Sequence, residues 1–119
     1  MVFITGGAYQ GKLDYAREQY GIRDEDVSVC TQESAPDQSR RCIVHLERYV
    51  RYCLQNGIEP ELRFREDAVL IGDDIFCGVV PIEPDLRVWR EETGRFYTQI
   101  SRGAQSVVRL FCGLPLQLK

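Results

Sequence analysis

Apolar positions along the chain form short runs that alternate with longer segments of helical repeat. Runs with continuous or alternating apolar residues begin at Val2, Val27, Ala68 and Val107, and each is short enough for a strand. The run at residues 68–72 is apolar at nearly every position, as in a central parallel strand covered on both faces. These runs predict four strands separated by long connections, with a short final strand after the Gly113 turn.

Three segments carry the helical repeat. Residues 12–20 place Leu13, Ala16 and Tyr20 at helical spacing. Residues 39–56 repeat apolar side chains every three to four positions and end at Asn56-Gly57, and residues 86–101 follow a Pro-Asp start. Residues 60–65 are expected to add a turn of helix. The polar segment 31–39 is expected to be a loop, either a lid beside a ligand site or a connection without a role.

The alternation of strands and helices predicts an α/β fold. We expect a three-layer sandwich with a mostly parallel sheet and an antiparallel edge strand at the C-terminus. The 119 residues, 44% of them apolar, correspond to one domain spanning 1–119.

The first turn of the chain has the composition of a phosphate-binding loop. It joins a strand to a helix, and four residues separate its first and last glycines, so that backbone N–H groups can surround an anion. Lys12, at the start of the helix, can reach the terminal phosphates, and the helix N-terminus adds positive charge. The residues expected to hold the phosphates are Gly6, Gly7, Ala8, Tyr9, Gln10, Gly11, Lys12 and Leu13. With this loop, the expected sandwich is of the phosphate-binding-loop (P-loop) NTPase type, and residues 1–119 form a single nucleotide-binding domain. The alternative is a glycine-rich turn that binds nothing.

Two further positions bear on metal binding. Leu13 stands where such loops carry the Ser or Thr whose hydroxyl binds magnesium, so the sequence supports nucleotide binding better than catalysis. Asp73 and Asp74 follow the apolar strand at residues 68–72, where a carboxylate can face a phosphate-bound Mg²⁺. Paired aspartates after a strand are also common turn formers.

Charge and cysteine content restrict the class of protein. A net charge of −3, from 15 basic and 18 acidic residues, argues against nucleic-acid binding. No segment is long and apolar enough to span a membrane, and the chain begins with a strand rather than a leader, so we expect a cytoplasmic location. The five cysteines are widely spaced, which favours small buried side chains over disulfides or a zinc site.

Other chemistry-bearing residues have ordinary explanations. His45, the single histidine, is expected on the helix at 39–56 as a surface or boundary residue rather than a catalytic one. Gly94, in the middle of a helix, indicates that a neighbouring helix or a ligand approaches the backbone there. Cys30, Cys77 and Cys112 end predicted strands, so they can gather at the edge of the sheet where ligands bind.

Three segments together resemble the adenosylcobinamide kinase and adenosylcobinamide-phosphate guanylyltransferase family of cobalamin biosynthesis. They are residues 6–12, GGAYQGK; residues 73–81, DDIFCGVVP, with Arg87, Arg90-Glu91 and Gly94-Arg95 beyond; and residues 112–119, CGLPLQLK. The resemblance covers the first 20 or so residues and nearly everything from Ala68 onward.

The resemblance implies a P-loop fold that binds ATP or GTP with Mg²⁺ and phosphorylates a corrinoid hydroxyl. It also implies GMP transfer through a histidine, and symmetric homo-oligomers. Position by position, it implies that Gly6 to Lys12 hold the phosphates and that Asp74 stands where the family has an acidic residue. Together with the loop and strand-end patterns, this makes Lys12 and Asp74 the expected catalytic residues and Asp73 and Asp74 the expected metal ligands. The chain departs from the family at Leu13 and Phe76, and residues 31–41 lack the family's histidine.

Two functions remain open at this point. One is a compact nucleotide-binding member that transfers phosphoryl groups to a corrinoid or another small hydroxylated substrate. The other is a non-catalytic descendant that binds nucleotide or only a partner protein, which the Leu13 substitution favours.

Overall fold

The structure, a computed structural model, describes all 119 residues of the chain. Its elements follow the order β1 (Val2–Gly6), α1 (Lys12–Tyr20), β2 (Val27–Val29), β3 (Cys42–Val44), α2 (Leu46–Gln55), β4 (Val69–Asp73), α3 (Pro84–Gly103), β5 (Ser106–Phe111) and β6 (Leu114–Gln117), with a 3-10 turn at Asp24–Asp26 ahead of β2.

One six-stranded sheet contains every strand. Its order is β2-β3-β4-β1-β5-β6, and all neighbouring pairs are parallel except β5 and β6. The predicted α/β class, the mostly parallel sheet and the antiparallel C-terminal edge strand are therefore confirmed.

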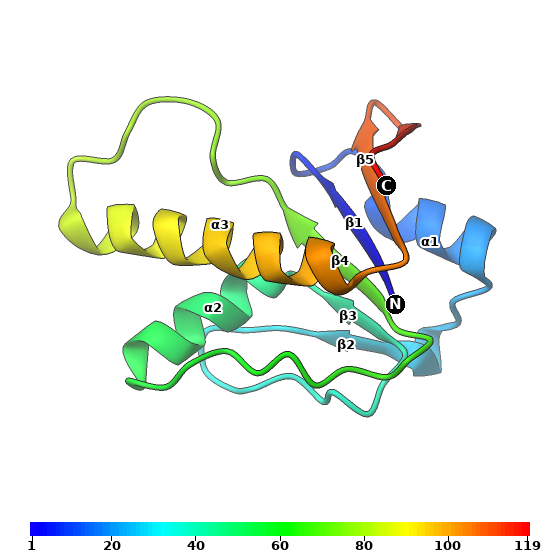
Figure 1. Cartoon of the computed structure of the whole chain (residues 1–119), viewed down its shortest axis with the longest axis horizontal. Coiled ribbons are helices and arrows are strands. Elements are labelled where there is room, and N and C mark those ends of the chain that lie inside the picture. Colours follow the sequence, from blue (N-terminus) through cyan, green and yellow to red (C-terminus); the bar gives the residue numbers. More distant parts are fainter.

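Helices cover both faces of this sheet (Figure 1). In β1, Phe3 points into the core under α2 and α3, whereas Ile4 points into the core under α1. In β4, Leu70 faces the first core and Ile71 the second. This alternation explains the continuous apolar run at residues 68–72, because both faces of a central strand need apolar side chains. No helix has both the length and the apolar character required to cross a bilayer.

The helix predicted at residues 39–56 is wrong in its first part. Residues 42–44 form β3, which pairs with β2 and β4, and α2 begins only at Leu46. His45 separates the two elements with a left-handed backbone (φ 63°, ψ 52°), which interrupts any continuous helix. The three-residue spacing of Ile43 and Leu46 imitates a helical repeat, because the two side chains enter the same core from different elements, β3 and α2.

The helical turn predicted at residues 60–65 is also absent. This segment is irregular, and the N–H of Glu61 donates to the Tyr49 hydroxyl at 2.8 Å instead of to a backbone carbonyl. The segment runs along α2 back to the start of β4. The predicted helix at 86–101 is confirmed and slightly longer than expected, at Pro84–Gly103.

The sheet changes winding direction between β1 and β4. These strands are neighbours, yet α1 follows β1 onto one face whereas α3, after β4, lies on the other (Figure 1). In parallel sheets, such a switch opens a crevice at the carboxyl ends of the two strands. Gly6 ends β1 there with φ +149°, and a Cβ on Gly6 would lie 2.5 Å from Leu110 O. The chain can therefore leave β1 at this angle only with glycine.

Candidate functional site

A cleft of about 630 Å³ opens at the carboxyl ends of β1, β3 and β4. The loop before α1 forms one wall, and the β3–α2 junction forms the other. Its lining residues are Ala8, Tyr9, Gln10, Gly11, Lys12, Leu13, Asp14, Val44, His45, Arg48, Ile71 and Asp73. Most of the predicted phosphate loop thus lies on one concave surface, at the switch point of the sheet.

The backbone of this loop presents free hydrogen-bond donors. No N–H group from Gly7 to Leu13 donates to another protein group, and the first one in α1 with a partner is that of Tyr15, 2.9 Å from Gly11 O. Gly11 has a left-handed backbone (φ 85°), and no side chain caps α1. The loop and the helix start therefore combine unpaired donors with the positive end of a helix dipole, which is an anion-binding arrangement.

Lys12 lies across the base of the loop. Its Nζ donates to Gly7 O at 2.6 Å and is 2.8 Å from Asp73 Oδ1, and its side chain is only 6% exposed. A buried ammonium needs such partners because desolvation of an unpaired charge is costly. The ion pair holds the ammonium between the carboxyl ends of β1 and β4.

Gln10 ties the loop to the C-terminal hairpin. Its side-chain Oε1 accepts a hydrogen bond from the N–H of Cys112, and its backbone carbonyl accepts one from Gly113 at 3.2 Å. The turn between β5 and β6 thus supports the loop from behind. These contacts place residues 112 and 113, remote in sequence, against the loop that lines the cleft.

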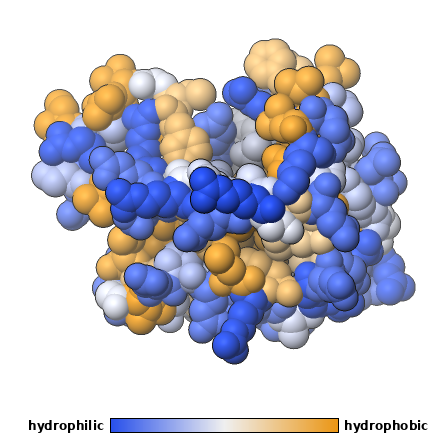
Figure 2. All heavy atoms as spheres, viewed as in Figure 1, coloured by the Kyte–Doolittle hydropathy of each residue, from blue (hydrophilic) through white to orange (hydrophobic).

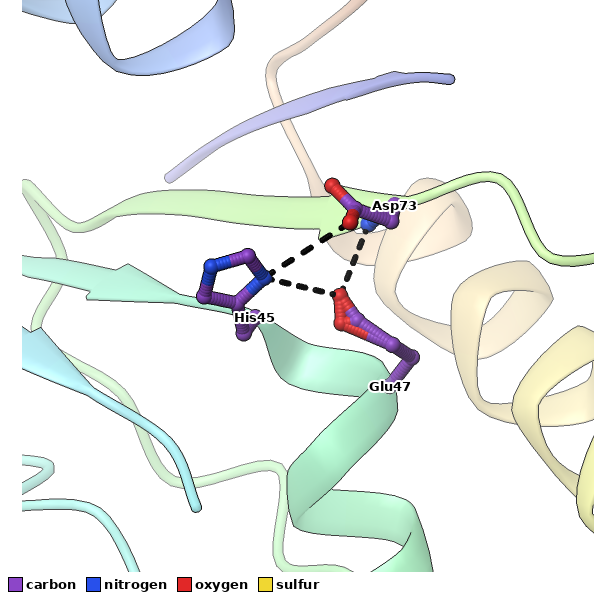
Figure 3. A group of neighbouring side chains, drawn as sticks. All are labelled: His45, Glu47 and Asp73. Carbon is purple, nitrogen blue, oxygen red and sulfur yellow. Dashed lines mark hydrogen bonds and ion pairs between the residues drawn. The ribbon is translucent and has the colours of Figure 1, made fainter. Parts of the chain in front are cut away.

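Three polar side chains, His45, Glu47 and Asp73, point toward one another at the end of β4 (Figure 3). His45 Nδ1 is 3.4 Å from Glu47 Oε1 and 3.7 Å from Asp73 Oδ2. The N–H of Asp73 donates to Glu47 Oε1 at 3.0 Å, and Glu47 is 3% exposed. The β3–α2 junction and the end of β4 therefore bring one imidazole and two carboxylates together. We call these three residues the His-Glu-Asp cluster.

The two aspartates predicted as metal ligands point in different directions. Asp73 lines the cleft, whereas Asp74 belongs to a separate hollow on the α3 side of the sheet. There Asp74 Oδ1 accepts a hydrogen bond from the Phe76 N–H at 3.0 Å, and Oδ2 is 3.5 Å from the Arg109 guanidinium. The structure brings Lys12 and Asp73 together and leaves Asp74 apart from them.

Leu13 and the polar loop also have clear places. Leu13 packs against the apolar core under α1 as well as lining the cleft, so its side chain has a structural role where a hydroxyl was expected. No residue of 31–39, the candidate lid, lines the cleft. Gly94 faces the edge of the Phe76 ring, with 3.6 Å from its ideal Cβ position to Phe76 Cε1, and it also lines the hollow that contains Asp74.

Sequence reasoning missed the β3–α2 side of the cleft. His45, Glu47 and Arg48 line or support it, but they were read as positions on one long helix. The available signal was a short apolar run, Cys42–Val44, followed directly by a polar residue and then a helix. Asp73 likewise ends a strand, but a three-residue strand is too short to stand out against the helical repeat.

The carboxylates of the cluster also affect the pKa values of buried neighbouring residues. Burial, together with the nearby Glu47 charge, raises the pKa of Cys30 to about 12. Burial also raises the pKa of Tyr97, with Glu47, Asp73 and Asp74 acting in the same direction. The Tyr97 hydroxyl donates to the backbone carbonyl of Asp73 at 2.9 Å, which fixes the end of β4 from the α3 side.

Comparison of the chain with models of known protein families finds no match, and no curated protein sequence matches it.

Proposed function

We propose that this chain is a P-loop domain that binds ATP or GTP through the phosphates. The observation that carries the proposal is the uninterrupted series of unpaired N–H groups from Gly7 to Leu13, directly before a helix. Polyphosphate is the ligand that such a series suits, because each oxygen accepts several hydrogen bonds and carries negative charge. The cleft of about 630 Å³ is of the size that small-molecule sites usually have.

Lys12 would pair with phosphate oxygens in this complex. Its ammonium lies next to the loop carbonyl of Gly7, so a short movement of the side chain exchanges that carbonyl for a phosphate oxygen. Asp73 would hold the ammonium from the opposite side. A lysine placed this way neutralises phosphate charge as a compact point charge.

Asp73 is also the residue that would hold Mg²⁺. It is the predicted carboxylate that lines the cleft, and Mg²⁺ prefers one or two carboxylates together with phosphate oxygens. The donor set therefore fits the ion without Asp74 or a hydroxyl at position 13. When bound, Mg²⁺ would neutralise charge on the phosphates.

The resemblance to the adenosylcobinamide kinase family extends the proposal to phosphoryl transfer onto a corrinoid hydroxyl. In that case the loop donors and Lys12 stabilise the charge that develops on the transferred group. A non-catalytic nucleotide-binding protein is the second candidate, and the packing of Leu13 against the α1 core favours it. Catalysis of the family type uses a hydroxyl at this position, and the leucine side chain cannot supply one.

Calorimetry with ATP and with GTP, each with and without Mg²⁺, tests the binding proposal. Lys12→Gln is the informative variant, because its amide can still donate to Asp73 while the charge is lost. We expect affinity to fall at least about tenfold, which corresponds to about 1.4 kcal/mol. Lys119→Gln is the matched control, since that lysine caps the end of α3 through Ser101 O and Arg102 O. Equal affinities of the Lys12 variant and the wild type would remove the phosphate role.

Turnover separates the two candidates. The kinase reading predicts that ADP or GDP forms from bound nucleotide when cobinamide is added and Mg²⁺ is present. The binding-module reading predicts tight nucleotide binding without such turnover. Absence of nucleotide binding excludes both.

The resemblance also implies symmetric homo-oligomers, and surface apolarity supports this part of the proposal. Apolar side chains gather over the loop between β4 and α3 and over the β5–β6 hairpin (Figure 2). The exposed members include Val79, Val80 and Ile82 in the loop and Phe111 and Leu114 in the hairpin. Large exposed apolar groups of this kind mark interaction surfaces.

A further inference from the structure

We propose that the His-Glu-Asp cluster is a binding site for a divalent transition-metal ion such as Zn²⁺, Mn²⁺ or Co²⁺. The ligands are His45 Nδ1 and the carboxylates of Glu47 and Asp73 (Figure 3). The ion binds in the absence of nucleotide, so the inference does not rest on the function proposed above.

The spacing of the donor atoms suits a single ion. One donor atom from each residue can be chosen so that all three lie within 4.8 Å of one another, and His45 Nδ1 is 3.4 Å from Glu47 Oε1 and 3.7 Å from Asp73 Oδ2. Ligands at about 2.0–2.2 Å from a tetrahedral metal lie roughly 3.4 Å from each other. The three side chains are therefore already close to the separation that a shared ion requires.

Two polar atoms of the cluster have no hydrogen-bond partner within the protein. His45 Nδ1 and Glu47 Oε2 are buried polar atoms that make no hydrogen bond, although the Glu47 side chain is only 5% exposed. A buried carboxylate oxygen without a partner is costly, and native structures rarely leave one. A metal ion bound by His45 and the Glu47 carboxylate would give Nδ1 a partner and would offset the charge of the buried carboxylate.

Local charge favours a cation at the same point. Lys12 compensates one carboxylate by its contact with Asp73 Oδ1, and this leaves Asp73 Oδ2 directed toward His45. The charge of Glu47 has no such partner when the imidazole is neutral. The competing explanation is a protonated His45 that donates to both carboxylates, and the experiment below separates the two.

The donor set indicates a transition metal rather than Mg²⁺. An imidazole nitrogen is a good ligand for Zn²⁺ and Co²⁺, whereas Mg²⁺ prefers oxygen and several retained waters. Three protein ligands with the cleft in front also leave coordination positions open, as in metal sites that exchange water or substrate. The carboxylate Oε1 of Glu47 is held by the Asp73 N–H, so the ligands are fixed before the ion arrives.

Calorimetric titration of the full chain with Zn²⁺, Mn²⁺ and Mg²⁺, together with Co²⁺ absorption, tests the site. Cys77 and Cys112 are exposed, so the background carries Cys77→Ser and Cys112→Ser to remove adventitious thiolate binding. We expect a single bound Zn²⁺ or Co²⁺ without a thiolate absorption band, and binding of Mg²⁺ at least about tenfold weaker.

His45→Asn and Glu47→Gln are the informative variants. Asparagine tolerates the left-handed backbone at position 45, and glutamine keeps an oxygen for the Asp73 N–H, so both should fold. Each should weaken metal binding at least about tenfold. Loss of a residue that only hydrogen-bonds to a metal ligand already causes a decrease of this size. Asp14→Asn, which removes an exposed carboxylate from the same cleft, should leave binding unchanged.

Three results would overturn the inference: no binding of any of these ions, equal binding by the His45 variant, or equal preference for Mg²⁺. A protonated-histidine cluster gives the first of these results. Lys12→Gln keeps this inference separate from the nucleotide proposal, because loss of a positive charge 2.8 Å from Asp73 should strengthen metal binding while it weakens nucleotide binding.

Discussion

Gly72 in β4 and Gly94 in α3 each lie against an aromatic side chain, Tyr97 and Phe76 respectively. A methyl group would have different effects at the two positions. A Cβ on Gly72 would overlap the Tyr97 hydroxyl, which is held by its hydrogen bond to Asp73 O. We predict that Gly72→Ala lowers the free energy of unfolding by about 1–3 kcal/mol, the usual effect of overpacking a core. Urea denaturation measures this loss.

Gly94→Ala is the matched counterpart. Its Cβ would make an ordinary contact with Phe76, 3.6 Å away, and alanine favours the helix over glycine. The free energy of unfolding should rise by roughly 0.5–1 kcal/mol. A loss at position 94 similar to that at position 72 would show that Phe76 packs more tightly than the structure indicates.

The thiols should divide into two reactivity classes. Burial raises the pKa of Cys30 to about 12 and that of Cys42 to about 11, so few of these thiols are ionised at pH 8, and Cys53 is buried as well. Iodoacetamide at pH 8 should modify Cys77 and Cys112 well before the other three, as peptide mass spectrometry can record. Bound nucleotide should slow Cys112, whose N–H donates to Gln10, more than Cys77. Fast labelling of Cys30 would contradict the burial of that thiol.

Single residues show how far the sequence predicts the site. The spacing from Gly6 to Lys12 predicted a loop that does line one wall of the cleft. Asp73 and Asp74 could not be told apart, because adjacent residues at the end of a strand point to opposite faces and the sequence does not reveal which face carries the cleft. Glu47 escaped notice because a buried glutamate looks like any helix-surface glutamate until its neighbours are known.

At the scale of elements, Arg90 fastens the long loop between β4 and α3. Its guanidinium donates to the carbonyls of Phe76 and Val79, and no other side chain of α3 donates to this loop. Arg90→Ala should therefore lower the free energy of local opening of residues 75–83 by about 1 kcal/mol. Amide hydrogen exchange in this loop should then become roughly fivefold faster.

Hydrogen exchange at the Phe76 amide reports this loosening, since that N–H donates to Asp74 Oδ1. Arg87→Ala provides the control, because Arg87 is exposed on the same helix and its side chain makes no hydrogen bond or ion pair. Equal exchange in the two variants would mean that the loop is held by its own backbone.

Elements with strong patterns were predictable, and those that depend on neighbours were not. The central strands and α3 follow from continuous apolar runs and a long helical repeat. By contrast, β3 has three residues and exists because β2 and β4 supply its hydrogen bonds on both sides. Tertiary pairing overrides the local helical repeat there, as it commonly does in short segments.

For the whole molecule, the proposed self-association can be tested at the exposed apolar loop. Replacing Val79 and Ile82 together by aspartate places two charges where both side chains are more than nine-tenths exposed. If this loop joins copies of the chain, sedimentation velocity should show a smaller species than for the wild type. Ile58→Asp, at a half-exposed apolar site beyond α2, should leave the sedimentation unchanged. A monomeric wild type would end this part of the proposal.

The left-handed backbone at His45 lowers the stability of the fold at a residue proposed to bind a metal ion. A residue with a side chain at φ 63° costs of the order of 1–3 kcal/mol, which glycine would not incur and asparagine would reduce. A laboratory selection for heat resistance alone should therefore replace His45 repeatedly, whereas a selection that also demands growth on limiting metal should keep it. The residues recovered at position 45 under the two selections would therefore show whether this histidine is kept for metal binding, without purification of the protein.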